Sequence, residues 1–223
     1  MARKKIVFVI VEGPSDEDSL GAVLSQLYDH NTVFFHIVHG DITTERSVSV
    51  ANILAKIGIV LRQYASSNHF RQTDFKEIIH LVDMDGAYVP DKCIILDDCE
   101  KPFYDLETIR TRNPGGISQR NIQKRSILDK LCATSSIWGI PYHVFYMSCN
   151  LDHVLHNKPN STDIDKETDS LDFAKKYISD IPGFLTFICH SDFSVVSEYD
   201  ESWRFIRQGT NSLHRHTNFG VFL

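Results

Sequence analysis

Apolar runs alternate with amphipathic stretches along the first third of the chain. Residues 6–11 form an apolar run without polar alternation, which is typical of a strand buried on both faces, as in a parallel sheet. Gly13 and Pro14 end this run, and Ser15 is placed to cap a helix with Asp18 as its capping-box partner. A helical apolar spacing then continues through Leu20, Val23, Leu24 and Leu27.

The same alternation repeats further along. Residues 32–38 ("TVFFHIV") predict a second strand and residues 77–82 ("EIIHLV") a third, with a helical apolar period through residues 50–64 between them. Because helices of this length between strands make parallel crossovers, the order predicts an α/β fold. We expect a Rossmann-like, mostly parallel sheet flanked by helices.

The regular alternation of strand and helix patterns ends after residue 90. Residues 91–118 contain a Pro-Gly-Gly breaker and predict an insertion or a mobile loop. Residues 121–132 predict a helix, and residues 142–148 ("YHVFYMS") a fourth strand. Residues 157–170 are polar and predict a linker or exposed loop, and helical spacing follows over residues 171–178.

Composition points to an ordinary globular protein. Of the 223 residues, 42% are hydrophobic, which suffices for one sizeable core. The five cysteines are scattered and show no C-x-x-C, which argues against a disulfide framework and a zinc ribbon. No apolar stretch approaches the roughly 20 residues that cross a bilayer, and "MARKK" leads directly into the first strand. We expect a cytoplasmic protein without a membrane partner.

Charge is unevenly distributed, although the formal net charge is −6. Residues 110–130 are basic and residues 163–201 are acidic. An acidic protein can still present one basic stripe to nucleic acid, but two solvated faces explain this pattern equally well. The candidate nucleic-acid-binding residues are Arg110, Arg112, Arg120, Lys124 and Arg125, with Arg204, Arg207 and Arg215 as further candidates.

Acidic residues follow the first and third predicted strands. Glu12 ends the first strand, and Asp83 and Asp85 end the third, where Gly86 permits a tight turn. The carboxyl ends of parallel strands gather at one edge of a sheet, where ligands bind. We therefore expect three carboxylates to meet, with no buried cation to neutralise them.

Such a carboxylate cluster favours a hard divalent cation. Oxygen ligands suit Mg²⁺ or Mn²⁺ better than zinc. A magnesium held by few carboxylates keeps positions for phosphate oxygens, and a pair of such ions stabilises both the attacking and the leaving oxygen of an in-line displacement. The chemistry that these residue types predict is phosphodiester hydrolysis.

Two motifs carry a family resemblance. The segment "VEGPSD" (residues 11–16) and the later "DMDG" (residues 83–86), each after an apolar strand, resemble the Toprim domain of topoisomerases, primases and OLD-family nucleases. E-G-x-S-D before an amphipathic helix looks closest to the OLD-family and phage-defence nucleases. The resemblance covers residues 5 to about 156, so we expect a Toprim-like catalytic domain over 1–156 and a C-terminal extension over 157–223 that packs on it.

The resemblance also implies roles for these residues. Glu12 matches the general acid/base or metal ligand of the family, and Asp83 and Asp85 match its magnesium-binding pair. Gly13, Asp16 and Gly86 are supporting positions. The implied activity is that of a Toprim-type Mg²⁺- or Mn²⁺-dependent endonuclease, a hydrolase acting on DNA or RNA.

The resemblance further suggests a biological setting. OLD-family nucleases often act with an ATPase, and this chain lacks G-x-x-x-x-G-K-[ST], so such a partner would be a separate ATPase of the AAA or ABC type. We expect an effector of antiviral defence or a toxin-like system. An oligomer is compatible with this assignment.

A further acid follows the fourth predicted strand. OLD-like proteins often carry E-x-E-x-x-L there, and this chain has "NLDHVL" at 150–155. Asn150 replaces the first acid, so Asp152 is the one candidate metal ligand in this element, and a second metal is in question. Asp152 could equally cap a helix.

Two alternatives to a nuclease stay open. A non-catalytic Toprim-fold binding or regulatory subunit would explain Asn150, whereas the retained Glu12, Asp83 and Asp85 count against it. "DMDG" also matches the D-x-D-G element of haloacid-dehalogenase-type phosphatases, but those proteins place it on the first strand. His153 and His156 have no evident third ligand nearby in the sequence, so they predict no metal site.

Overall fold

The computed structural model describes residues 5–27, 33–39, 43 and 47–223, with the backbone alone for 33–39. The chain folds into two compact units. Unit one comprises Met1–Leu81, Ser126–Val144 and Ser170–Ile181, and unit two comprises Val82–Arg125, Phe145–Asp169 and Pro182–Leu223. Unit two contains residues on both sides of position 156, and the domain boundary expected there stays a prediction.

A mixed β-sheet is built mainly from residues of unit one, and two of its strands end with residues that belong to unit two. Its strands are β1 (Lys5–Val11), β2 (Val33–His39), β3 (Phe75–Asp83), β7 (Ser136–Ile137) and β8 (Ile140–Ser148), in the order β2-β1-β3-β8-β7. β1 is parallel to β2 and to β3, whereas β7 and β8 are antiparallel to each other. The expected α/β class is confirmed, with a sheet that mixes both strand directions.

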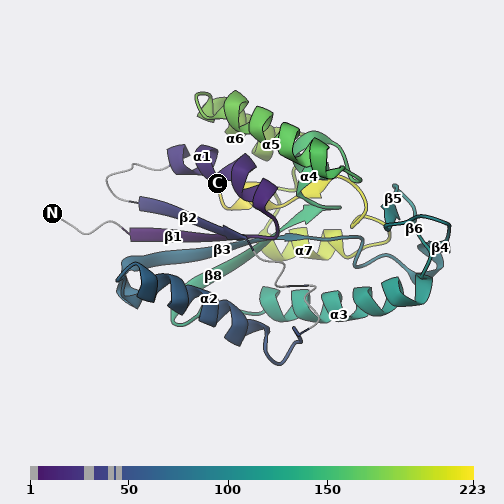
Figure 1. The fold of residues 1–223 in the computed structure, drawn as a ribbon, viewed down its shortest axis with the longest axis horizontal. Helices are drawn as coiled ribbons and strands as arrows, with labels where there is room; N and C mark the ends of the chain where they lie inside the picture. The colour runs from purple at the N-terminus through teal and green to yellow at the C-terminus, as the bar shows by residue number, and fades with distance from the viewer. Residues whose placement is uncertain (1–4, 28–32, 40–42, 44–46) are drawn as a thin grey trace. The chain divides into compact units, whose positions relative to one another are not determined.

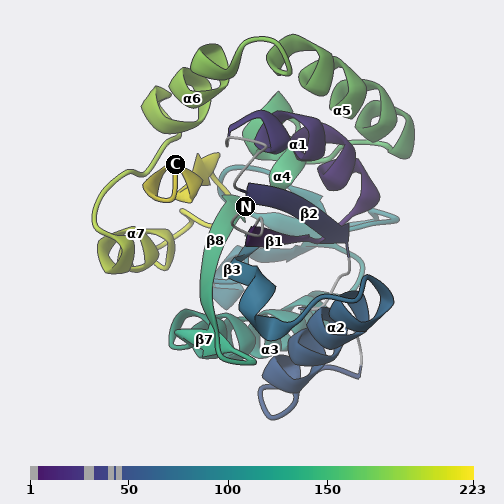
Figure 2. The same cartoon turned by 90° about the vertical axis from the view of Figure 1, so that its left-hand side faces the viewer.

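The interior position of β1 follows from its sequence. Residues 6–11 are all buried, as their uninterrupted apolar run predicts. Helix α1 (Pro14–Leu27) covers one face of the sheet and α2 (Ile53–Ser67) the other, as Figures 1 and 2 show. Each helix turns an apolar stripe inward, formed by Leu20, Val23 and Leu24 in α1 and by Ile53, Ile57 and Leu61 in α2.

The start of α1 differs from the expected one. The helix begins at Pro14, so Gly13 occupies the capping position and Ser15 already lies within the first turn. The Asp16 carboxylate accepts the N–H of Gly13 at 2.8 Å. The expectation that Ser15 caps the helix with Asp18 is therefore wrong, because the helix starts earlier and brings Asp16 to the third position.

A small sheet forms part of unit two. Strands β4 (Ile94–Leu96), β5 (Phe103–Tyr104) and β6 (Ile109–Thr111) pair in the order β4-β6-β5, beside the amino-terminal end of α3 (Pro114–Cys132) in Figure 1. Residues 91–118 are thus largely structured rather than a loop. The pairing is parallel between β4 and β6 and antiparallel between β5 and β6.

Short helices complete unit two. They include α4 (Leu151–His156), the start of α5 (Asp163–Tyr177), α6 (Ile181–His190) and α7 (Tyr199–Ile206), and β9 (His216–Thr217) pairs antiparallel with the end of β8. Because α5 begins at Asp163, the polar stretch 157–170 is only in part a loop. Single 3-10 turns occur at Gln72–Asp74, Asp91–Cys93 and Phe219–Val221. Within the described residues, no helix has the length and apolar character to span a membrane.

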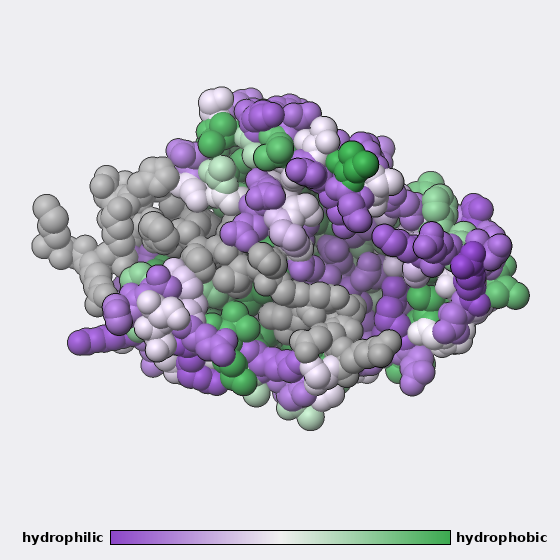
Figure 3. Space-filling view, in the orientation of Figure 1, coloured by the Kyte–Doolittle hydropathy of each residue, from purple (hydrophilic) through white to green (hydrophobic). Residues whose placement is uncertain are grey.

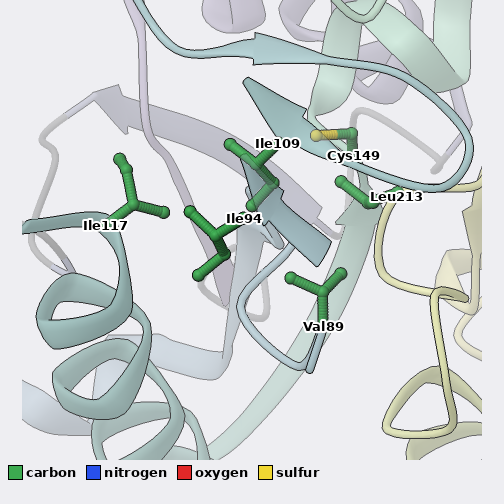
Figure 4. Close-up of a cluster of buried hydrophobic side chains, with 6 residues drawn as sticks. All are labelled: Val89, Ile94, Ile109, Ile117, Cys149 and Leu213. Carbon is green, nitrogen blue, oxygen red and sulfur yellow. The ribbon is translucent and has the colours of Figure 1, made fainter. Parts of the chain in front are cut away.

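One apolar cluster organises the small sheet. Its buried members come from distant parts of the sequence and are Val89, Ile94, Ile109, Ile117, Cys149 and Leu213 (Figure 4). They join β4, β6, the first turn of α3 and the residue that follows β8. Two members of this cluster, Ile109 and Leu213, lie against Gly86 in the turn after β3. The face of the molecule drawn in Figure 3 is mostly hydrophilic, with dispersed apolar side chains.

Candidate functional site at the end of strand β3

The D-M-D-G segment forms a rigid turn at the end of β3. The N–H of Met84 donates to the carbonyls of Met147 and Cys149, both at 3.0 Å, and the N–H of Asp85 donates to the Cys149 carbonyl at 2.7 Å. Asp85 and Gly86 adopt left-handed backbone conformations with φ of 47° and 64°. These bonds tie the turn to the end of β8 and set the directions of the two aspartates.

Asp83 is oriented by a backbone donor. Its Oδ1 accepts the N–H of Leu151 at 2.9 Å, at the start of α4. The cap of α4 is Asn150, whose side chain accepts the N–H of His153 at 2.9 Å. Asp152 is therefore not the cap. Its buried carboxylate lies 3.3 Å from the Nζ of Lys166.

Asp85 faces a buried lysine. The Nζ of Lys124 lies 2.5 Å from Oδ2 of Asp85, and the lysine side chain is only 1% exposed. The expectation that no buried cation neutralises these carboxylates is therefore wrong for Asp85. The ammonium of Lys124 is held inside the protein and is not presented to a phosphate backbone.

A second cation reinforces this arrangement. Arg120 donates one N–H to the backbone carbonyl of Asp85 at 2.7 Å and another to the Tyr104 hydroxyl at 2.9 Å. The neighbouring Asn121 donates to the Gly86 carbonyl at 3.2 Å. Both residues on α3 thus hold the turn that carries Asp85.

These cations set the ionisation of Asp85. Burial acts to raise the pKa of its carboxyl, but the charges of Lys124 and Arg120 outweigh that effect, so the pKa lies below the ordinary value. Asp85 is consequently a carboxylate at neutral pH. Its charge contributes to the raised pKa of Arg120, against the effect of burial.

Two other ionisable groups near Asp85 stay neutral. Burial, followed by the negative charge of Asp85, raises the pKa of Tyr104 and that of Cys149. Neither a phenolate nor a thiolate forms readily in such surroundings. Of these three groups, Asp85 is therefore the one that carries a negative charge at neutral pH.

Glu12 lies in unit one. Its Oε1 accepts a hydrogen bond from the hydroxyl of Thr43 at 2.9 Å, and Thr43 is buried. Asp83 and Asp85 belong to unit two. The meeting of Glu12 with these two aspartates stays a prediction.

A metal site was expected from Glu12, Asp83, Asp85 and Asp152. Across the described part of the chain, no group of three or more His, Cys, Asp or Glu side chains is placed to hold a metal ion. Magnesium, however, is commonly bound by one or two carboxylates, with water and substrate phosphates as the other ligands. Asp83 and Asp85 meet that smaller requirement as hard oxygen donors on one rigid turn.

The predicted basic stretch divides into two groups. Arg120 and Lys124 point toward Asp85, as described above. Arg110 and Arg112 are more exposed and form ion pairs with Asp105 at 3.1 Å and with Asp98 at 2.6 Å. Arg125 is partly buried. Nucleic-acid contact by these residues stays a prediction, and only part of the stretch faces solvent.

The three later arginines also contact protein groups. Arg204 lies 3.7 Å from Glu201, and Arg207 lies over the Tyr88 ring at 5.7 Å. Arg215 donates to the Val154 carbonyl at 2.7 Å. Their predicted contact with nucleic acid also stays a prediction.

Comparison with protein families, with curated proteins and with solved structures returns no match for this chain. The Toprim resemblance therefore rests on the residues of the two motifs.

The sequence contains a signal for the buried lysine. Ile117, Asn121, Lys124 and Leu128 recur at helical spacing and share the buried face of α3. A charged residue within an apolar stripe predicts a buried partner of opposite charge. Tyr104 and Thr43 have no such signal, because their contacts with Arg120 and Glu12 join segments that no local pattern connects.

Proposed function

We propose that the protein is a metal-dependent nuclease that hydrolyses phosphodiester bonds of DNA or RNA. The observation that carries this proposal is the turn after β3. It presents Asp83 and Asp85 from a backbone fixed by three hydrogen bonds, and it keeps Asp85 ionised through Lys124 and Arg120. A fixed pair of carboxylates is what a magnesium site with open positions requires.

Different residues would bind the metal, orient its ligands and transfer the proton. Asp83 and Asp85 would hold Mg²⁺ or Mn²⁺, which when bound polarises a phosphoryl oxygen and activates water. The N–H of Leu151 orients Asp83, and Lys124 prevents protonation of Asp85. Glu12, by its motif, would take a proton from the attacking water or serve as a further ligand.

The finer assignment is part of the same proposal. The motifs support an OLD-like Toprim nuclease of the cytoplasm that acts in antiviral defence with a separate ATPase. Asp152 is a weaker candidate ligand than the other acids, because it is buried beside Lys166 and Asn150 replaces the acid expected before it.

A non-catalytic nucleic-acid-binding or regulatory subunit is the second candidate. The observation that favours it is the ion pair of Asp85 with the buried Lys124, because this carboxylate is neutralised without any metal. A binding subunit would retain the fold and would bind nucleic acid without a divalent cation.

The decisive experiment measures cleavage and metal binding on the same variants. Labelled plasmid, single strands and total tRNA are incubated with Mg²⁺, Mn²⁺ or EDTA, with and without a candidate ATPase. We expect Asp83→Asn and Glu12→Gln each to lower the rate at least about 100-fold. The exposed Asp172 on α5 provides the control, and Asp172→Asn should cut as the parent does.

Direct Mn²⁺ binding gives the second readout. The parent should bind Mn²⁺ in solution, as measured by calorimetry or by electron paramagnetic resonance, and Asp83→Asn should weaken that binding. If the parent binds no Mn²⁺, or if Asp83→Asn binds and cuts as the parent does, the nuclease proposal is wrong. Metal-independent binding of nucleic acid would then support the regulatory subunit.

A further inference from the structure

Unit two contains a cavity of about 440 Å³ beside the turn after β3, and Asp152 is the one candidate metal ligand that lines it. It lies between β5 and the segment that joins α4 to α5. The side chains of Phe103 and Tyr104 line it on one side, and Asp152 and Lys166 line it as an ion pair. Its volume is in the range of ordinary small-molecule sites, about 300–1,000 Å³.

The cavity wall is connected to both aspartates of the turn. Tyr104 accepts a hydrogen bond from Arg120, which also donates to the backbone of Asp85. Asn150, another lining residue, directly precedes the Leu151 N–H that holds Asp83. A ligand in this cavity would therefore lie beside the proposed phosphodiester chemistry.

The cavity is preformed by side-chain hydrogen bonds. The Asn160 side chain accepts the N–H of Tyr104 and donates to its carbonyl, both at 2.8 Å. Asn150 donates to the Pro159 carbonyl at 2.9 Å. The segment that closes the cavity is thus fastened to β5 and to the start of α4, so little ordering is needed on binding.

Phe103 gives the cavity an exposed aromatic surface. Its side chain is 42% exposed, and the Arg110 guanidinium lies 5.4 Å from its ring centroid. Asp105 holds that guanidinium with two N–H···O bonds of 3.1 and 3.2 Å. An aromatic ring kept in place beside a cavity with both polar and apolar walls is suited to stacking, because a planar base gains contact without disordering the wall.

The charges around the cavity indicate the class of ligand. Lys101 and Lys166 oppose Asp152 and Asp163 along the lining, so the walls carry no net charge. Neutral walls with an aromatic face suit a nucleobase, which is uncharged and has polar edges.

We propose that this cavity binds one base of a single-stranded nucleic acid, stacked on Phe103. The inference deepens the proposed function, on which it rests, by naming a single strand as the substrate class. A duplex keeps its bases stacked inside, so only a single strand or a flipped base can fill the cavity.

The test measures binding in EDTA, where no cleavage can occur. The anisotropy of fluorescein-labelled single-stranded RNA, single-stranded DNA and a blunt duplex is followed during titration with protein. We expect Phe103→Ala to weaken single-strand binding about 5- to 150-fold and Phe103→Trp to retain it, because one stacked base contributes about 1–3 kcal/mol. Duplex binding should not change.

Leu106 provides a matched control. It is 58% exposed in the connection between β5 and β6 and lines no part of the cavity, so Leu106→Ala should bind as the parent does. Equal effects of Phe103→Ala and Leu106→Ala would refute the inference. Full competition by mononucleotides at the same concentration of base would also refute a strand-binding site.

The two proposals fail in different ways. Phe103-dependent binding of single strands, without cleavage under any metal, would leave the cavity assignment intact and remove the nuclease. Cleavage that needs Asp83 but is unchanged in Phe103→Ala would support the nuclease and contradict the cavity assignment. Photo-crosslinking of a 4-thiouridine strand should label the peptide that contains Phe103 and Tyr104, and labelling confined to other peptides would contradict the cavity assignment.

Discussion

Lys124 and Asp85 form a partly buried ion pair, with 2.5 Å between Nζ and Oδ2, a lysine side chain that is 1% exposed and an aspartate side chain that is 20% exposed. The pair joins the middle of α3 to the turn after β3. Removing one partner of a buried pair leaves an uncompensated charge, which destabilises far more than the pair itself stabilises. This asymmetry makes the pair testable by a double-mutant cycle.

We expect Lys124→Met to lower the free energy of unfolding by about 3–5 kcal/mol. Adding Asp85→Asn should recover part of that loss, because the negative charge that lost its lysine partner is then removed. Urea denaturation of the parent, both single variants and the double variant measures the coupling. If the proposed metal site exists, Mn²⁺ should raise the melting temperature of Lys124→Met more than that of the parent. Independent, additive effects of the two substitutions would show that the pair is not coupled.

Gly86 is expected to tolerate no side chain. A Cβ at this position would lie 2.7 Å from Cδ2 of Leu213 and 2.9 Å from Cδ1 of Ile109, on a backbone with φ of 64°. Gly209 has a similar φ of 53° with open space around it, so it isolates the backbone effect. Denaturation should show Gly86→Ala destabilised by about 2–4 kcal/mol and Gly209→Ala by about 1 kcal/mol. Equal losses would mean that the apolar cluster yields to the extra methyl group.

The first turn of α1 gives a third prediction. Asp16→Ala removes the acceptor of the Gly13 N–H and should lower the free energy of unfolding by about 1 kcal/mol. Asp18 is exposed on the same helix, so Asp18→Ala should change stability by no more than about 0.5 kcal/mol. A larger loss in Asp18→Ala than in Asp16→Ala would restore the capping box first expected at Ser15.

Two histidines of unit two should make the folding stability depend on pH. Burial lowers the pKa of His216, with a further contribution from His214, and burial together with Arg215 lowers the pKa of His153 to about 4. Among the described residues, Nδ1 of His216 is buried without a hydrogen-bond partner.

The lowered pKa values of these histidines make the folded protein less stable at acid pH. Below about pH 6.5 the unfolded chain binds protons that the folded chain does not, so stability falls as pH drops toward 4. Each such histidine contributes a slope of at most about 1.4 kcal/mol per pH unit. Urea titrations at pH 7.5, 6.5 and 5.5 should show a smaller slope for His216→Gln than for the parent. The control His143→Gln alters an exposed residue of β8, and an equal reduction there would contradict the assignment.

The elements with strong periodicity were predictable from the sequence. β1 is fully buried over 6–11, as an uninterrupted apolar run requires, and the helical spacing from Leu20 to Leu24 identifies α1. Boundaries were less predictable, because the first turn of α1 depends on which acid accepts the Gly13 N–H. The small β4-β6-β5 sheet was missed because strands of two or three residues leave no measurable alternation.

The candidate site was predictable only in its acids. Asp83 and Asp85 follow directly from a strand that ends in D-M-D-G. The charge balance around Asp85 does not follow from the basic stretch, which predicts a surface position for Lys124, whereas the helical phase of this residue places it inward. A stretch of like charges on a helix therefore requires its phase to be considered before any residue is assigned to a surface.

The amide of Asn160 has a consequence for association. β5 lies at the edge of its sheet, and an edge strand exposes backbone groups that can recruit another chain. Asn160 occupies both the N–H and the carbonyl of Tyr104, so a foreign strand finds neither group available at that residue. The Asn160 side chain therefore makes the two backbone hydrogen bonds that a neighbouring strand would make at Tyr104. Its removal would leave this strand edge exposed to pairing with another chain and so to aggregation.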